Sequence, residues 1–292
     1  MMMMMIFNDI SLSLCATFCL CSDAVSNLLG ALTCATIYDI PEVTLFFAGK
    51  LFRGNRCIKN DCDSLDAFSS MNYPPLVTMG VTDKVNWQKL RPPPSAALQP
   101  ALSLSSEVAV FRLFPGFTAL ALENILKPPM KGLVLSTFGS GNMPDTRLDV
   151  LDVLHKASAR GVVLVNVTQC ARGRVEAHYA TGTALLEAGV VSGHDMTVEA
   201  ALAKLAVLLA TEESVDEVRK LLSEDLRGEL TPQKEFERIS LHTSSFISAV
   251  HDTLVRPSRS SSSSRNDATR QKEEMKLISK ALSPVLLCSA AK

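Results

Sequence analysis

Short apolar runs alternate with longer amphipathic stretches between residues 108 and 232. Apolar runs of this length are typical of buried strands, and apolar residues spaced three or four apart indicate helices. The pattern predicts strands over 108–113, 133–137, 162–167 and 190–191, and helices over 118–126, 145–158, 179–187 and 197–209. Because strands that alternate with helices form parallel βαβ units, we expect a small doubly wound, flavodoxin-like α/β domain here.

Two helix starts carry a capping signal. Thr197 precedes an apolar helical pattern, and a threonine there can accept a hydrogen bond from a free backbone amide of the first turn. A last helix opens with Ser214-x-x-Glu217, the pattern of a capping box. We therefore predict that these side chains cap their helices.

The pattern before residue 108 is less regular. Apolar residues first recur at helical spacing and then form a strand-like run: Leu28, Leu29, Leu32 and Ala35, followed by Val43 to Phe47. A further strand is predicted over 76–81. The proline run 92–94 breaks regular structure, because each proline fixes φ and removes a backbone donor. We expect a domain boundary between about 90 and 107.

The two ends of the chain differ from the rest. Leu12 to Leu20 resembles the apolar core of a secretory signal, but Met1 to Met5 contains no Lys or Arg, which such a signal carries. Beyond residue 232 the pattern fades, and the serine-rich run 256–265 is typical of a flexible linker. No run reaches the roughly 18 apolar residues that span a bilayer, so we expect no membrane partner.

Charge and cysteine content argue against three further classes of protein: nucleic-acid-binding proteins, metal-binding proteins and secreted proteins held by disulfides. With 29 basic and 30 acidic residues the chain has no global attraction for phosphate backbones, so no nucleic acid partner is expected. The 8 cysteines show neither paired C-x-x-C spacing nor nearby histidines, so no metal site is predicted. So few cysteines in so long a chain do not form a secreted disulfide framework, and we expect a cytoplasmic protein.

A glycine-rich turn, STFGSGNMPDTR, follows the strand predicted over 133–137. Ligands bind beyond the carboxyl ends of parallel strands, and Gly139 and Gly141 would let backbone amides approach one. A dinucleotide fingerprint needs a small residue where Pro144 stands and an acid about twenty positions later, where the next strand ends in Asn166 and Thr168. We therefore expect no dinucleotide and no other cofactor.

Several long motifs, in one order, closely resemble the C-terminal domain of type I (cytosolic) L-asparaginases: GLVLSTFGSGNMP, VNVTQCARGRVEAHYATG and VVSGHDMTVEAALAKLAVLLA, followed by DLRGELTP. Upstream, NLLGAL and IPEVTLFFAGKLFRGNRCIKN resemble the later part of that family's N-terminal domain. The resemblance covers about Ser22 to Pro232. It is nearest to animal asparaginases that are also described as lysophospholipases and carry C-terminal ankyrin repeats.

This resemblance implies an organisation and an activity. The expected segments are 1–21, unlike the family; 22–107, a remnant of the N-terminal α/β domain with its linker; 108–232, the C-terminal domain; and 233–292, a flexible tail. The family is homo-oligomeric and hydrolyses the side-chain amide of asparagine to aspartate and ammonia. A threonine attacks to form an acyl-enzyme, and a second threonine, a lysine and an aspartate move the protons.

Site residues follow from the matched motifs. Lys59 in RGNRCIK matches the proton-transfer lysine; the alternative is a solvated loop lysine. Tyr179 in EAHYATG matches a tyrosine that reaches the substrate from the partner subunit; the alternative is a half-buried tyrosine that opens a helix. Candidates for the same interface are Asn142 in GSGN, Thr168 and Gln169.

An allosteric asparagine site of bacterial members involves the cysteine of TQC, here Cys170, and the threonine before the lysine. Ile58 stands at that threonine position and cannot offer a hydroxyl. This argues against allosteric control, and Cys170 is then expected to be a small buried residue.

The beginning of the chain departs from the family. No segment matches the glycine-rich first strand with the nucleophilic threonine, the H-G-T-D-T segment or the T-G-S-Q segment. We expect an N-terminally truncated chain that is inactive alone and leaves strand edges and apolar faces uncovered. The alternatives are a non-catalytic module that binds asparagine-like ligands or pairs with full-length subunits, and a lysophospholipase, for which no G-x-S-x-G elbow is present.

Overall fold

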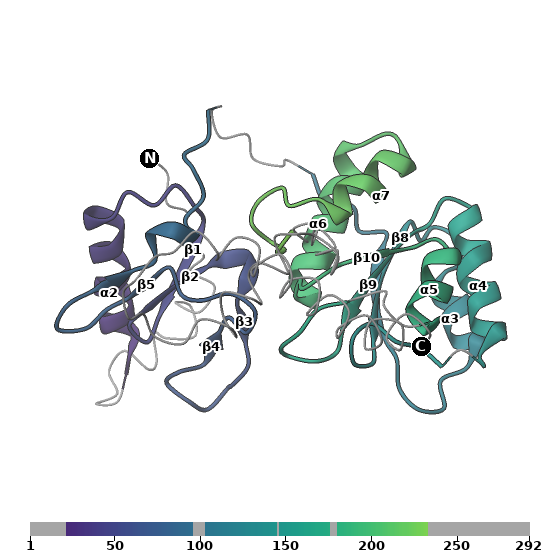
Figure 1. The fold of residues 1–292 in the computed structure, drawn as a ribbon, viewed down its shortest axis with the longest axis horizontal. Coiled ribbons are helices and arrows are strands. Elements are labelled where there is room, and N and C mark those ends of the chain that lie inside the picture. Colours follow the sequence, from purple (N-terminus) through teal and green to yellow (C-terminus); the bar gives the residue numbers. More distant parts are fainter. Residues whose placement is uncertain (1–21, 96–102, 145, 176–179, 233–292) are drawn as a thin grey trace, which may run out of the picture. The chain divides into compact units, whose positions relative to one another are not determined.

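The computed structural model describes residues 22–95, 103–144, 146–175 and 180–232 (Figure 1). Three features considered in the sequence lie outside these residues: the segment 12–20, Tyr179 and the serine-rich run 256–265. All described residues belong to one unit that ends at Pro232.

A four-stranded parallel sheet forms the centre of the C-terminal part. Its strands, in the order β10-β9-β8-β7, are Val190–Ser192, Val163–Thr168, Gly132–Thr137 and Val108–Arg112. All three pairings are parallel, which confirms the predicted βαβ units. Both β8 and β9 are buried along their whole length, as strands covered on both faces are, and this explains their unbroken apolar runs.

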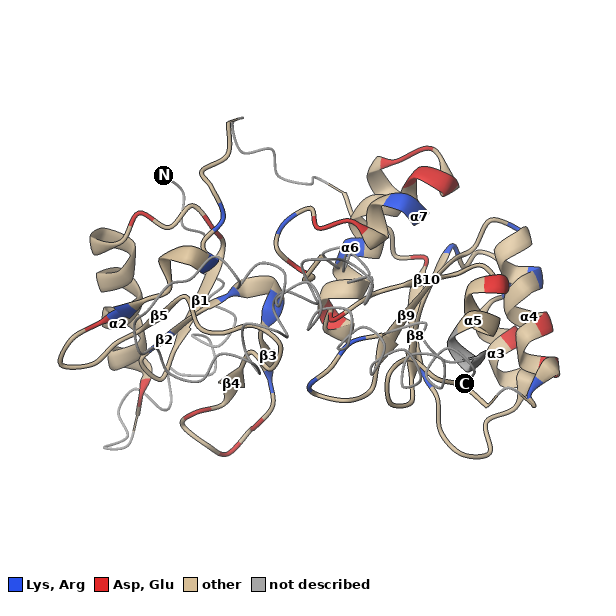
Figure 2. Ribbon diagram, viewed as in Figure 1, with Lys and Arg blue, Asp and Glu red and all other residues tan. Residues whose placement is uncertain are grey.

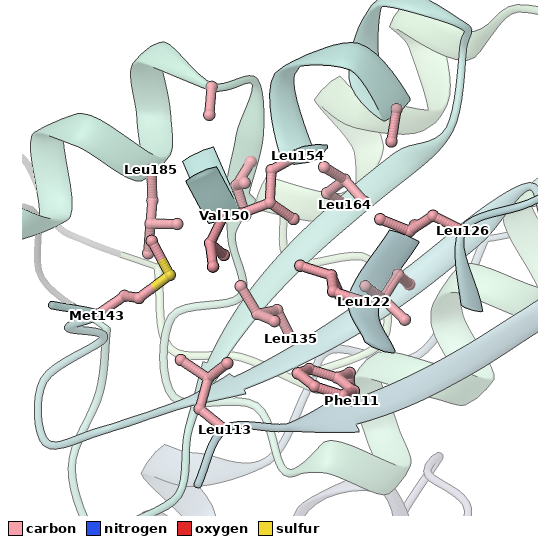
Figure 3. Packing of buried hydrophobic residues seen from close by; sticks show 14 of the residues in the cluster. Phe111, Leu113, Leu122, Leu126, Leu135, Met143, Val150, Leu154, Leu164 and Leu185 are labelled. Carbon is pink, nitrogen blue, oxygen red and sulfur yellow. The ribbon is translucent and has the colours of Figure 1, made fainter. Parts of the chain in front are cut away.

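Helices cover both faces of this sheet, as a doubly wound fold requires. One face carries α3 (Ala119–Ile125), α4 (Leu148–Ala159) and α5 (Ala180–Glu187), and the other carries α6 (Val198–Thr211) and α7 (Val215–Ser223). Alternate residues of the strands supply the two cores. Leu135 and Leu164 pack with α3, α4 and α5 (Figure 3), whereas Val134, Val163 and Val165 pack with α6 and α7.

The helix caps agree with the sequence in one case and not in the other. The Thr197 hydroxyl accepts a hydrogen bond from the Ala200 amide at 3.1 Å, as predicted. At α7, however, Ser214 makes no side-chain cap, so the predicted capping box is wrong. The Glu217 carboxylate instead accepts from Lys220 Nζ at 3.2 Å, one turn along the helix.

The N-terminal part has its own sheet. The helix α2 (Ala24–Ile37) packs on an antiparallel sheet of β1 (Thr44–Phe47), β2 (Lys50–Arg53), β5 (Val77–Thr78) and β6 (Lys84–Val85). Short 3-10 turns span Gly54–Arg56 and Trp87–Lys89. A separate hairpin pairs β3 (Ile58–Lys59) with β4 (Phe68–Ser69). The helix and strands predicted from residues 28–47 are therefore present, and the strand predicted over 76–81 shortens to β5.

One side of this N-terminal part is uncovered in the region that the structure describes. β1 stands at the end of the strand order, so only β2 pairs with it there. Five large apolar residues of α2 are between 41% and 63% exposed: Val25, Leu28, Leu29, Leu32 and Ile37. No helix of the described ranges is long and apolar enough to cross a bilayer.

Candidate functional site

Lys59 lies on the β3–β4 hairpin, which belongs to neither large sheet. Its strand partner is Phe68, and Lys59 Nζ lies 5.8 Å from the centroid of the Phe68 ring. The lysine is exposed. A cation over an aromatic face at this distance is held by a modest attraction and keeps its contact with water. The ammonium is therefore accessible to a small molecule that approaches the hairpin.

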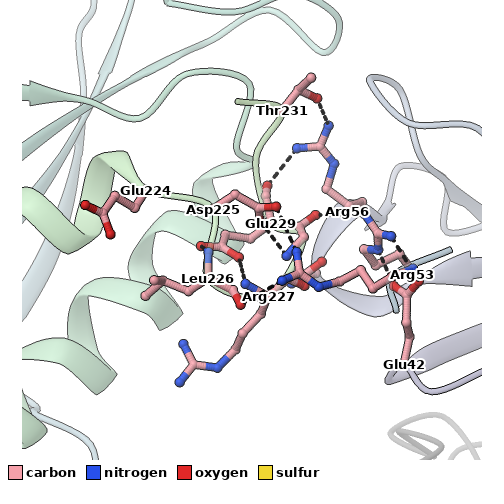
Figure 4. Close-up of polar contacts among 12 residues, drawn as sticks. Glu42, Arg53, Arg56, Glu224, Asp225, Leu226, Arg227, Glu229 and Thr231 are labelled. Carbon is pink, nitrogen blue, oxygen red and sulfur yellow. Dashed lines mark hydrogen bonds and ion pairs between the residues drawn. The ribbon is translucent and has the colours of Figure 1, made fainter. Parts of the chain in front are cut away.

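The turn before this hairpin is anchored by Arg56. Its guanidinium is buried and donates to both carboxylate oxygens of Asp195, at 2.9 Å and 2.7 Å. It also donates to the Glu229 carbonyl at 2.7 Å and to Thr231 Oγ1 at 2.9 Å (Figure 4). Such bidentate, charge-assisted contacts fix orientation as well as distance. The chain segment that leads into Lys59 is therefore fastened to residues that follow the parallel sheet.

Asp195 is the centre of this network. Besides both Arg56 contacts, its carboxylate accepts from the Thr231 amide at 2.7 Å and from the Thr231 hydroxyl at 2.7 Å. Burial alone would raise the pKa of this carboxyl, but the hydrogen bonds from Arg56 and Thr231 outweigh burial and hold the pKa below its usual value. Asp195 is therefore ionised at neutral pH, and both of its carboxylate oxygens accept hydrogen bonds from Arg56 and Thr231.

Arg53 makes a second link to the same C-terminal segment. Its guanidinium forms a buried, bidentate pair with Glu42 and donates to the Gly228 carbonyl at 3.3 Å (Figure 4). Gly228 has φ of +79°, and a Cβ at this position would lie 2.7 Å from Arg53 Nη1. Only glycine fits such a backbone beside the guanidinium. Residues 225–231, the DLRGELT segment, thus form a strap that contacts both arginines.

Lys204 and Glu229 hold the strap on its other side. Lys204 Nζ lies 2.6 Å from Glu229 Oε1 and donates to the Leu222 carbonyl at 3.1 Å. The carboxylate also accepts from the backbone amides of Leu226 and Arg227. Although burial favours the protonated form, Lys204 and backbone amides, that of Leu226 among them, hold the pKa of Glu229 below its usual value. At the other end of the pair burial outweighs the contact with Glu229 and lowers the pKa of Lys204, so the carboxylate is the better compensated of the two charges.

Asn72 joins the hairpin to the loop after β9. Its amide nitrogen donates to the Gly173 carbonyl at 2.9 Å, and its amide oxygen accepts from the Gly173 nitrogen at 2.9 Å. Beside it lies a narrow cleft whose lining includes Ile58, Ala171 and Asp195. Ile58 and the loop that follows Cys170, which the resemblance connects with allosteric control, are thus brought to one place.

The predicted residues at the end of β9 make contacts within the chain. Gln169 Nε2 donates to the carbonyls of Leu113 and Ser136, at 2.7 Å and 2.8 Å, so it braces the ends of β7 and β8. Thr168 Oγ1 donates to the Gly139 carbonyl and accepts from the Cys170 amide. Cys170 itself is exposed, so the expectation of a small buried residue is wrong.

The glycine-rich turn holds a side chain of the neighbouring strand. Asn166 Nδ2 donates to the Gly141 carbonyl at 3.0 Å, and its amide oxygen accepts from Thr137 Oγ1 at 2.6 Å. The Gly141 and Asn142 amides both donate to the Phe138 carbonyl. Asn142 Nδ2 donates to Ser140 Oγ at 3.3 Å. Because these amides close the turn itself, they are not presented to a phosphate.

Sequence patterns did not single out Arg56, Asp195 or the strap. Each lies inside a quoted motif, but a buried arginine and its distant aspartate have no local spacing that reveals them. Tyr179 belongs to the residues that the structure leaves undescribed. Across the described ranges, no group of three or more His, Cys, Asp or Glu residues could hold a metal ion.

Comparisons with known proteins identify the family of both parts. The model of the N-terminal asparaginase domain matches residues 14–92, and that of the glutaminase/asparaginase C-terminal domain matches residues 107–222. An L-asparaginase from Dirofilaria immitis is 41% identical over 280 residues, which cover 92% of this chain and 43% of that protein. The 60 kDa lysophospholipase of Homo sapiens is 44% identical over 273 residues, which cover 92% of this chain and 45% of that protein.

The solved structures give the same answer. L-asparaginase I from Vibrio cholerae superposes with a TM-score of 0.69 at 44% sequence identity, covering 73% of this chain and 64% of that one. The chain spans less than half the length of the two relatives named above. Both domain models match in family order, and the fold agrees with a solved relative at high identity. The chain therefore belongs to the asparaginase family.

Proposed function

We propose that this chain is part of an L-asparaginase-type amidohydrolase, which converts asparagine to aspartate and ammonia in the cytoplasm as a homo-oligomer. Lys59 serves as the proton-transfer lysine of the site. The observation that carries this assignment is the anchoring of its turn: Arg56, three residues before Lys59, is fixed by Asp195 of the C-terminal part. A catalytic group must be held within a fraction of an ångström. The contacts of Arg56 with Asp195 hold the turn before Lys59 in one position, as this requires.

Further residues have roles within this proposal. Substrate or subunit contacts are assigned to Tyr179, Asn142 and Thr168, and Gln169 supports the same site. Because the Gln169 side chain braces two strand ends, it acts by shaping the loop and not by touching the substrate. Cys170 is exposed beside this loop, but Ile58 offers no hydroxyl, so we propose no allosteric asparagine site.

We further propose that these 292 residues alone do not turn over asparagine. The resemblance places the nucleophilic threonine and the Thr-Asp pair in T-G-G-T and H-G-T-D-T segments, and this sequence contains neither. Without a nucleophile, a lysine that moves protons has no acyl-transfer step to assist. The chain then supplies the lysine-bearing side of the site, and another polypeptide segment supplies the nucleophile.

The test measures ammonia release from asparagine and from glutamine by protein purified from a host that lacks asparaginases. We expect no release above the blank from the chain alone. Coexpression with the part of the Vibrio cholerae L-asparaginase I that lies outside the 64% covered by this chain should give turnover. Lys59→Met, which keeps the side-chain length and removes the charge, should abolish that turnover, whereas Lys50→Met should not. Normal turnover by the chain alone would overturn the proposal of incompleteness.

Two other functions compete with this one. A non-catalytic module would bind asparagine, or pair with an intact asparaginase subunit, and would give no turnover in the coexpression experiment. Hydrolysis of lysophosphatidylcholine is suggested by the name of the human relative, 60 kDa lysophospholipase. This chain has no G-x-S-x-G elbow, so release of fatty acid from that lipid is not expected.

A further inference from the structure

His194 holds a strained backbone position in the loop 193–197, between β10 and α6. Its φ is +53°, and of the described residues other than glycine only Ala48 also has a positive φ. Two hydrogen bonds fix the backbone there. The His194 carbonyl accepts from the Val175 amide at 2.9 Å, and the His194 amide donates to Ser192 Oγ at 3.2 Å. Because such strain persists only where surrounding contacts impose it, the loop can relax once those contacts are lost.

The His194 side chain is suited to its place only while it is neutral. Its Nδ1 atom is buried and has no hydrogen-bond partner in the part of the chain that the structure describes. A neutral imidazole can leave this nitrogen unprotonated. Protonation puts a proton on both ring nitrogens, so Nδ1 becomes a buried donor without an acceptor. Since an unpaired buried donor is costly, the protonated ring is driven toward water.

The charges around the imidazole also disfavour the protonated ring. Lys204, the single basic residue of α6 (Figure 2), and Arg174, in the loop after β9, act on it from two other segments. Burial is the main reason that the pKa of His194 lies below its ordinary value of 6.5. The neighbouring Asp195 opposes this shift, and the two positive charges add to it. The Asp195 carboxylate is already bound by Arg56, so it does not offer His194 a free counter-charge.

His194 is directly joined to the anchor of the turn before Lys59. Asp195 follows it in the chain and binds the Arg56 guanidinium through both carboxylate oxygens. The Asp195 carbonyl also accepts from the Asn72 side-chain amide at 3.2 Å. A rotation of the backbone at His194 carries Asp195 with it. Release of the imidazole therefore loosens the contacts that hold the turn.

We propose that His194 is a pH-sensitive latch: the neutral imidazole holds its loop closed on Arg56, and the protonated imidazole moves into water and lets the loop open. Because burial lowers the pKa, the closed loop has its full stability above pH 6.5 and loses it as the pH falls through the value of the buried ring. This range lies above that in which Asp195 and Glu229 titrate. The latch concerns the position of Lys59 and does not depend on the proposed activity.

Hydrogen exchange of the full chain tests the latch without substrate, as protection factors that remove the intrinsic pH dependence of exchange. The amides of Val175 and of residues 54–60 should lose protection roughly five- to tenfold between about pH 7.5 and pH 5.5, the rise in opening expected for an open ring of ordinary pKa. The amides of β8 and β9 should keep theirs. His194→Asn stays uncharged and tolerates a positive φ, so it should remove the pH dependence. His155→Asn, at an exposed position of α4, should leave the pH dependence unchanged.

A further variant imitates the protonated ring. His194→Lys carries a charge at both pH values, so the same amides should be poorly protected at both. Equal pH dependence in the unaltered chain and in His194→Asn would overturn the proposal, and so would protection that does not change with pH in the unaltered chain. Low protection of His194→Asn at both pH values would mean that the ring serves packing alone, which also contradicts a latch. An equal loss in β8 and β9 would show that acid opens the whole domain instead.

Discussion

Arg56 and Asp195 are 139 positions apart in the chain, yet their side chains form a buried bidentate pair with nitrogen–oxygen distances of 2.9 Å and 2.7 Å. The pair joins the turn before Lys59 to the loop that opens α6. Because Thr231 donates to the same carboxylate, the strap closes over both charges. The position of the candidate lysine therefore depends on residues of three separate chain segments.

Removing one member of this pair should be costly. Asp195→Ala leaves the buried Arg56 guanidinium without its counter-charge, and the loss of one partner of a buried pair costs about 3–5 kcal/mol of unfolding free energy. Denaturant unfolding measures this loss. Asp216→Ala is the matched control, since its carboxylate is 90% exposed and pairs with Arg219 at the surface. The control should change stability by less than about 1 kcal/mol. Equal effects would mean that the pair does not anchor the turn.

Acid should lower the unfolding free energy, because it protonates the buried carboxylates of Asp195 and Glu229. The pKa values of Asp195 and Glu229 lie below their ordinary values of 3.8 and 4.5. A depressed pKa gives stability that is complete above the unfolded value and is lost as pH falls through the folded value. Unfolding free energy should therefore be level near neutrality and fall below about pH 4. Asp195→Asn should make this acid slope shallower, and Asp216→Asn should leave it unchanged.

The parallel sheet and its helices could be predicted because burial on both faces leaves unbroken apolar runs such as Val163 to Val167. The N-terminal strands were harder, since β5 and β6 have only 2 residues each and show no period. The link between Arg56 and Asp195 has no local signal at all. At the site, the matched motif identified Lys59 but did not predict the β3–β4 hairpin that carries it. The sequence also led to the wrong prediction that Cys170 is buried.

The two helix starts offer a matched test of capping. Thr197 caps α6 by accepting from the Ala200 amide, whereas Ser214 at α7 makes no side-chain bond. Thr197→Ala should therefore reduce the unfolding free energy by about 1 kcal/mol. Ser214→Ala should change it by no more than a few tenths of that amount. Thermal unfolding of both variants measures the difference, and a larger loss for Ser214→Ala would show that the capping box forms in solution.

Gly141 combines two demands that only glycine meets. Its φ is +99°, and a Cβ would lie 2.6 Å from Val175 Cγ1 and 3.1 Å from the Asn166 amide nitrogen. Gly116 has a similar φ of +90°, but nothing lies within 4 Å of its Cβ position. Gly116→Ala should therefore cost about 1 kcal/mol, from backbone strain alone.

Gly141→Ala adds a steric clash and displacement of the Asn166 side chain from the turn. We expect it to cost about 2–4 kcal/mol in total, because overpacking adds to the strain. Chemical unfolding of the two alanine variants gives both values. The backbone amides that Gly141 and Asn142 donate to Phe138 should also exchange faster with solvent in Gly141→Ala. If the two substitutions cost the same, the close packing of Val175 against this turn is not what requires glycine there.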